Sequence, residues 1–127
     1  MNYEEEIQQL QGTWAFDLLE VEGRKLPDTM YRGSTLEIKG DTFITRALEA
    51  TYEGKLQLRP EAAPKTIDMI FTGGPEKGKT SFGIYEVEGD TLKICLGFTG
   101  APRPQAFMSK PGTGHAFEIL RRKTPGS

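Results

Sequence analysis

The sequence predicts an all-β fold, an antiparallel up-and-down barrel of eight strands, or nine, behind a short N-terminal helix. Three observations support this prediction. Short segments alternate between apolar and polar residues, two hairpins share a Gly-Asp turn at residues 40–41 and 89–90, and no long helical pattern separates the strands. A meander of this length avoids exposed edges best by closing into a barrel.

The first elements are a helix and a strand. Residues 2–10 place apolar side chains at helical spacing, and three glutamates in the first turn suit the helix dipole. Residues 13–21 alternate as a strand with Trp14, Phe16 and Leu18 together on one of two partly apolar faces. Residues 23–33 then form a long connection, which could pack as a cover over the barrel.

The next strands are predicted over residues 36–39 and 42–48, joined by Gly40-Asp41, so that Ile38 faces Phe43 and Leu36 faces Thr45. Two more strands are predicted next, in which apolar and polar residues alternate. Their apolar sides carry Tyr52, Gly54, Leu56 and Leu58, and then Ile67, Met69 and Phe71.

The clearest hairpin spans residues 81–96. With Gly89-Asp90 as its turn, Tyr85 faces Ile94 and Val87 faces Leu92 on an apolar side. The other side is expected to face outward and carries Glu86, Glu88, Thr91, Lys93 and Cys95.

The last strand is predicted over residues 114–122, with Phe117 and Ile119 on one face and Leu120 and Arg122 on the other. Alternate connections of such a barrel share an end. The long connections therefore gather at one mouth, and the two tight turns close the other end.

The composition fits one domain over residues 1–127 with a frayed tail at residues 123–127. The single cysteine suits a reducing compartment, no apolar run approaches the roughly 20 residues of a membrane span, and the acidic N-terminus differs from a signal peptide. We expect a cytoplasmic protein without a membrane partner. A net charge of −2 also disfavours nucleic acid as a partner.

Two features resemble known families. Gly12-Thr13-Trp14 and Arg121-Arg122 resemble the lipocalin pattern, in which a G-x-W on the first strand packs against a basic residue of the last strand; Arg122 is the partner we expect. The wider pattern is similar to an uncharacterised bacterial lipocalin-like domain family best known from planctomycetes. It comprises LQGTW, PKTID, GKTSFGIYEVEGDTLKICL, RPQAF and EILRR. This resemblance implies a calycin-type barrel and almost nothing about activity.

Few residues suggest catalysis. His115 has no local nucleophile or acid, Cys95 has no partner for a metal cluster or redox pair, and the GGPEKGK loop lacks phosphate-binding spacing. Asp68 faces solvent or, after a one-residue shift, the interior. Arg103, fixed between two prolines, either contacts a ligand at the mouth or ties the long loop to the barrel.

The main functional hypothesis is therefore a small-molecule barrel for an apolar or aromatic ligand, without metal or cofactor. Its predicted ligand-binding residues are Phe16, Leu36, Phe43, Tyr52, Met69, Phe71, Tyr85, Ile94, Arg103 and Phe107. One alternative is a cofactor-independent isomerase, cyclase or hydrolase that uses Arg103, Tyr85 and Asp68. The other is a filled scaffold that binds a protein, because an eight-stranded barrel can be packed solid.

Overall fold

The structure is a computed structural model that describes residues 2–47 and 49–123. The strand end predicted at Leu48 and the tail predicted after Lys123 lie outside the described residues. The elements are α1 (Tyr3–Gln9), β1 (Gly12–Val21), β2 (Arg24–Lys25), α2 (Asp28–Tyr31), β3 (Thr35–Lys39), β4 (Thr42–Ala47), β5 (Ala50–Arg59), β6 (Thr66–Gly73), β7 (Thr80–Glu88), β8 (Thr91–Gly97) and β9 (His115–Arg122).

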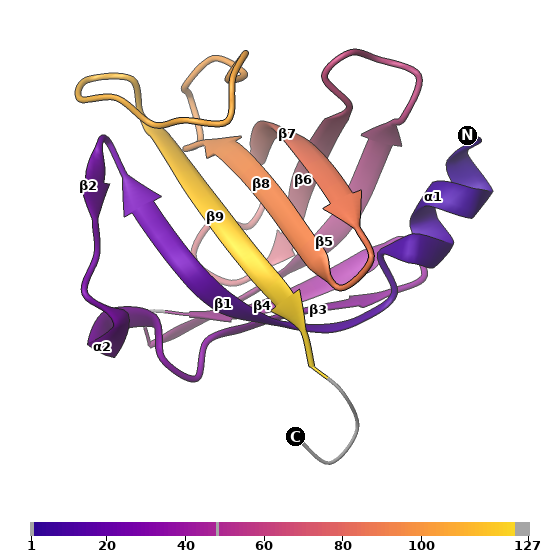
Figure 1. Ribbon diagram of the computed structural model, residues 1–127, viewed down its shortest axis with the longest axis horizontal. Helices are drawn as coiled ribbons and strands as arrows, with labels where there is room; N and C mark the ends of the chain where they lie inside the picture. The colour runs from indigo at the N-terminus through magenta and orange to yellow at the C-terminus, as the bar shows by residue number, and fades with distance from the viewer. Residues whose placement is uncertain (1, 48, 124–127) are drawn as a thin grey trace.

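The strands form one antiparallel sheet that closes on itself. Its order is β2-β1-β3-β4-β5-β6-β7-β8-β9, and β1 also pairs with β9, so eight strands make the barrel. The two-residue β2 pairs antiparallel with the end of β1. Figure 1 shows α1 at one end of the barrel, with β2 and α2 toward the other. The predicted all-β barrel with an N-terminal helix is confirmed.

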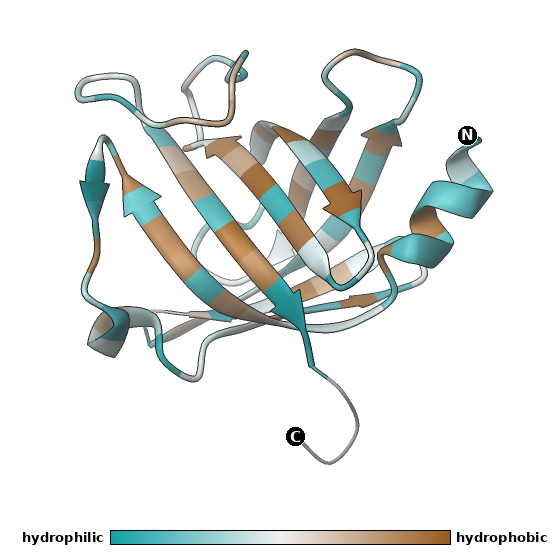
Figure 2. Ribbon diagram, in the orientation of Figure 1, coloured by the Kyte–Doolittle hydropathy of each residue, from teal (hydrophilic) through white to brown (hydrophobic). Residues whose placement is uncertain are grey.

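Both tight hairpins have the predicted register. Ile38 pairs with Phe43 across β3 and β4, and Tyr85 pairs with Ile94 across β7 and β8. The glycines that open the two turns have φ values of 61° and 60°, as the first loop position of such hairpins requires. Along β5 buried and exposed residues alternate, as expected for a strand with one face on the core; Figure 2 shows hydrophobic bands interrupted by hydrophilic ones along β8 and β9.

The structure corrects the predicted alternation in β1. Trp14 and Phe16 share the interior face as predicted, but the pairing with β9 shifts between Phe16 and Leu18. This bulge adds one residue to β1, so Leu19 and Val21, rather than Leu18, line the interior beyond it.

The closed end is packed solid beneath α1. Trp14 is fully buried, and the guanidinium carbon of Arg122 lies 4.3 Å from the centre of its ring, which confirms the predicted stacking. The Trp14 indole donates to the carbonyl of Leu10 at 2.9 Å, and Arg122 donates to the carbonyls of Gln9 and Gln11. These contacts tie the end of α1 to the first and last strands.

Candidate functional site

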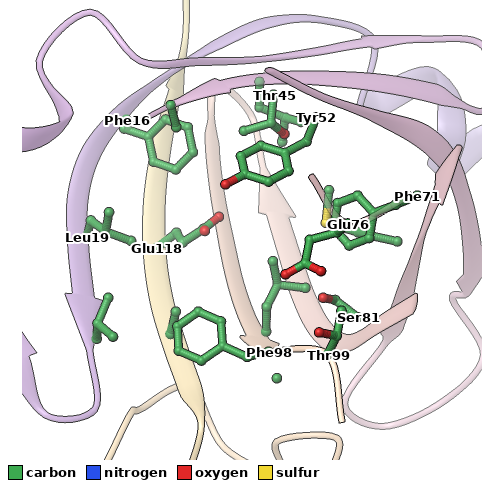
Figure 3. Close-up of a pocket in the computed structure, with 17 residues that line it drawn as sticks. Phe16, Leu19, Thr45, Tyr52, Phe71, Glu76, Ser81, Phe98, Thr99 and Glu118 are labelled. Carbon is green, nitrogen blue, oxygen red and sulfur yellow. The ribbon is translucent and has the colours of Figure 1, made fainter. Parts of the chain in front are cut away.

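A cavity of about 340 Å³ occupies the half of the barrel away from α1. Every barrel strand contributes to its wall, and the loops after β6 and β8 complete the rim. The lining residues are Phe16, Leu19, Val21, Leu36, Thr45, Ala47, Tyr52, Met69, Phe71, Glu76, Ser81, Leu96, Gly97, Phe98, Thr99, Ala116 and Glu118, most of which are apolar. Figure 3 draws these residues as sticks and labels ten of them.

The interior is hollow where several inward positions near the mouth carry small residues. An eight-stranded barrel is about wide enough for side chains to fill. At the closed end large residues do so, including Trp14, Phe43 and Tyr85. Nearer the mouth, inward positions are held by small residues such as Ala47 and Ala116, and the interior remains hollow.

The most unusual wall residue is Glu118 of β9. It pairs with Leu19 of β1 and Ile94 of β8, so its neighbours on both adjacent strands are apolar. Figure 3 shows its carboxylate pointing into the cavity. Within residues 2–47 and 49–123 the carboxylate has no hydrogen-bond or ion-pair partner. Burial raises the pKa of Glu118 to about 8, so the group is mostly protonated at neutral pH.

The other polar groups of the cavity are hydroxyls and one carboxylate. The Tyr52 hydroxyl points into the cavity, and its ring lies 6.0 Å from that of Phe71. Glu76, in the loop after β6, also lines the cavity but forms an ion pair of 3.3 Å with Lys79. Among the described residues that line the cavity there is no lysine, arginine or histidine. The cavity is therefore apolar with an acidic bias.

The structure brings together only part of the predicted ligand-binding set. Five of the ten line the cavity: Phe16, Leu36, Tyr52, Met69 and Phe71. Three others, Phe43, Tyr85 and Ile94, face the interior but belong to the packed core below the cavity. The interior direction of these three agrees with the alternation in the sequence, which carries no information on their height along the barrel axis.

Arg103 and Phe107 lie outside the barrel instead of at its mouth. The Arg103 guanidinium forms an ion pair of 2.7 Å with Asp68 on β6 and donates to the carbonyl of Gly83 on β7 at 2.8 Å. It also lies 5.2 Å from the centre of the Phe82 ring. Phe107 packs edge-on against Phe117, with 6.5 Å between ring centres. The loop between β8 and β9 thus folds over the outer face, and Arg103 ties it there.

This loop also covers the single cysteine. Cys95 has the predicted outward register but is fully buried, and its thiol donates to the carbonyl of Met108 at 3.4 Å. Burial raises its pKa to about 11, so it stays protonated. His115 begins β9, and its ring nitrogen Nε2 lies 2.9 Å from the carbonyl oxygen of Pro102. Neither residue lines the cavity.

The predicted catalytic group does not assemble. Arg103 and Asp68 meet each other on the outer face, whereas Tyr85 lies in the interior at the closed end. There, the Tyr85 hydroxyl donates to the fully buried carboxylate of Glu6 at 3.0 Å, and the Lys65 ammonium also donates to it at 2.7 Å. Burial and the bond to Glu6 raise the pKa of Tyr85. This cluster fixes α1 beneath the barrel.

Sequence reasoning missed Glu118, although the signal was present. Glu118 stands two residues before Leu120 and four before Arg122, and both were predicted to share one face of the last strand. Because Arg122 was expected to stack on Trp14, period two places Glu118 on that same face. An acidic residue at an interior position is rare and was the pattern to follow.

None of the described helices is long and apolar enough to span a membrane. Comparison of the chain with models of protein families, with curated proteins and with solved structures found no match.

Proposed function

We propose that the barrel binds a small, predominantly apolar or aromatic molecule in its cavity. The observation that carries this proposal is the hollow of about 340 Å³ above a solidly packed closed end. Packed barrels have few voids larger than a water molecule, so a hollow of this size favours ligand binding over a filled scaffold.

The walls indicate the kind of ligand. Phe16, Met69 and Phe71 provide aromatic and polarisable surface, which suits a flat ring system. The hydroxyl of Tyr52, which points into the cavity, can form one directed hydrogen bond. Ligand pockets span about 300 to 1,000 Å³, so this cavity suits a molecule of about two fused rings.

Binding of a neutral aromatic probe tests the proposal. N-phenyl-1-naphthylamine fluoresces more strongly in apolar surroundings, and we expect saturable enhancement with the purified protein. Ala47→Phe on β4 and Ala116→Phe on β9 each place a ring in the cavity from a different strand. Both should weaken the probe's binding at least about tenfold, because the hollow is then occupied.

Ala106→Phe is the matched control, because Ala106 is exposed in the loop between β8 and β9. It should bind the probe as the unmodified protein does. Circular dichroism and thermal melting show which variants are folded. If folded Ala47→Phe and Ala116→Phe proteins both keep the unmodified affinity, the cavity is not the binding site and the proposal is wrong.

A further inference from the structure

Apart from Tyr52, the ionisable side chains that line the cavity are both acidic. Its two carboxyl side chains are Glu118, deep in the wall, and Glu76, at the rim. Glu76 is partly neutralised by Lys79, whereas Glu118 has no partner in the described part of the chain. No basic side chain among the described residues lines this space. An anionic ligand would therefore find no positively charged side chain in the described cavity wall.

A buried carboxyl group without a partner destabilises the folded state. Burial disfavours its charged form and leaves its polar atoms without hydrogen bonds. A leucine would suit the neighbours of Glu118, which are Leu19 and Ile94. The carboxyl group instead points into the hollow, where a bound molecule could supply its partner. A cation attached to an apolar body complements both the charge and the walls.

We propose that the cavity takes an amine with an apolar or aromatic body, and that the ammonium group of this ligand pairs with the carboxylate of Glu118. The inference rests on the proposed function and narrows it to one ligand class. The apolar body lies against the aromatic wall, and the Tyr52 hydroxyl can accept a second hydrogen bond from the ammonium group.

Binding is coupled to proton release. Near neutral pH Glu118 is mostly protonated, because its pKa is raised to about 8. The carboxyl proton leaves to solvent when an ammonium ion binds, so charge balances: a neutral acid and a cation become an ion pair plus one free proton. The titratable groups around Glu118 are Tyr52 and Glu76 at the cavity, and Glu20 of β1 and Cys95 of β8 on the outer face. Cys95 stays protonated here, because its own pKa is about 11.

The coupling predicts the direction in which the affinity changes with pH. The affinity for an ammonium ion should rise about fifty-fold between pH 6 and pH 8, as Glu118 loses its proton, and then level off. A ligand with a carbonyl group would accept a hydrogen bond from the protonated acid, so its affinity would fall over the same range. The direction of the change therefore separates a cationic ligand from a neutral acceptor.

Three matched naphthalenes make the test: 2-(1-naphthyl)ethylamine, 2-(1-naphthyl)ethanol and 1-naphthylacetate. Calorimetric titrations at pH 6, 7 and 8, in buffers of different ionisation enthalpy, give both affinity and protons released. At pH 8 the amine should bind at least about tenfold more tightly than the alcohol, and the acetate most weakly. At pH 7 the amine should release about 0.9 proton.

Glu118→Gln keeps the shape of the side chain and removes the charge. It should lose the preference for the amine, the proton release and the pH dependence. Binding of the alcohol to this variant shows that its cavity is still open. Glu86→Gln is the control, because Glu86 is exposed on β7 and does not line the cavity. It should change none of these.

The outcomes separate this inference from the proposed function. If the alcohol binds and the amine binds no more tightly, or if Glu118→Gln keeps the amine preference, the amine inference is overturned and the cavity remains a binding site. If the amine, the alcohol and the N-phenyl-1-naphthylamine probe all fail to bind, the proposed function falls with it.

Discussion

The raised pKa of Glu118 predicts how the stability of the protein varies with pH. In the folded protein this pKa is about 8, because burial in the cavity wall disfavours the charged form of the carboxyl group. In the unfolded chain a glutamate has a pKa of about 4.3. Between these values the folded state holds a proton that the unfolded state has lost, so the free energy of unfolding must fall as pH rises.

The size of this loss of stability follows from the width of the pH range between the unfolded and folded pKa values of Glu118. Each pH unit inside it changes the free energy of unfolding by about 1.4 kcal/mol. From pH 5 to pH 8 the contribution of Glu118 should therefore fall by about 3 to 4 kcal/mol. Glutamine carries no titrating proton, so Glu118→Gln should lack this contribution and should be the more stable protein at pH 8.

Urea denaturation at pH 5, 6, 7 and 8 measures the difference directly. Subtracting the curve of Glu118→Gln from that of the unmodified protein cancels every other titrating group, provided that the sites act independently. Glu86→Gln, on the exposed face of β7, should give a difference that changes little with pH. A flat difference for Glu118→Gln would refute the reasoning, because it would mean that water hydrates the carboxylate inside the cavity.

Three further predictions concern the scaffold. Trp14→Ala should lower the free energy of unfolding by about 3 to 5 kcal/mol, because it removes a fully buried ring and the surface on which Arg122 stacks; a loss below about 1 kcal/mol in urea denaturation would contradict this packing. Gly40→Ala and Gly89→Ala should each cost about 1 to 3 kcal/mol by the same assay, because φ is positive at both; since a Cβ added at either position would meet no atom within 4 Å, the cost is one of backbone strain, and neutral substitutions would show that the turns relax freely. Arg103→Ala should lower stability by about 1 to 3 kcal/mol and leave probe binding unchanged, with lysine restoring part of the loss, because its contacts lie on the outer face; weaker binding at unchanged stability would place it at the ligand.

Much of the fold could be predicted because turn chemistry and period-two alternation act locally. Gly40-Asp41 and Gly89-Asp90 set the register of two hairpins, and each register set which residues face inward. The bulge in β1 carries no such local signal, since Asp17 and its neighbours read as an unbroken strand. Leu18 was therefore assigned to the wrong face.

The site was harder to predict because alternation gives the face of a residue and not its height. Phe43 and Phe71 both point inward, and their rings lie 5.7 Å apart, yet only Phe71 reaches the cavity. The path of the loop between β8 and β9 depends on long-range contacts such as the ion pair of Arg103 with Asp68. Its sequence alone could not show that it folds away from the mouth.

The occupancy of the cavity can be observed directly through methionine methyl groups. Met69 lines the cavity, whereas Met30 and Met108 are 51% and 48% exposed at the surface and serve as internal controls. Protein labelled with carbon-13 at the methionine methyl groups is titrated with N-phenyl-1-naphthylamine and followed by NMR. We predict a saturable shift of the Met69 signal, caused by the ring current of the bound probe, with the Met30 and Met108 signals unchanged. A Met69 signal that stays fixed while the probe binds would contradict a ligand site inside the barrel.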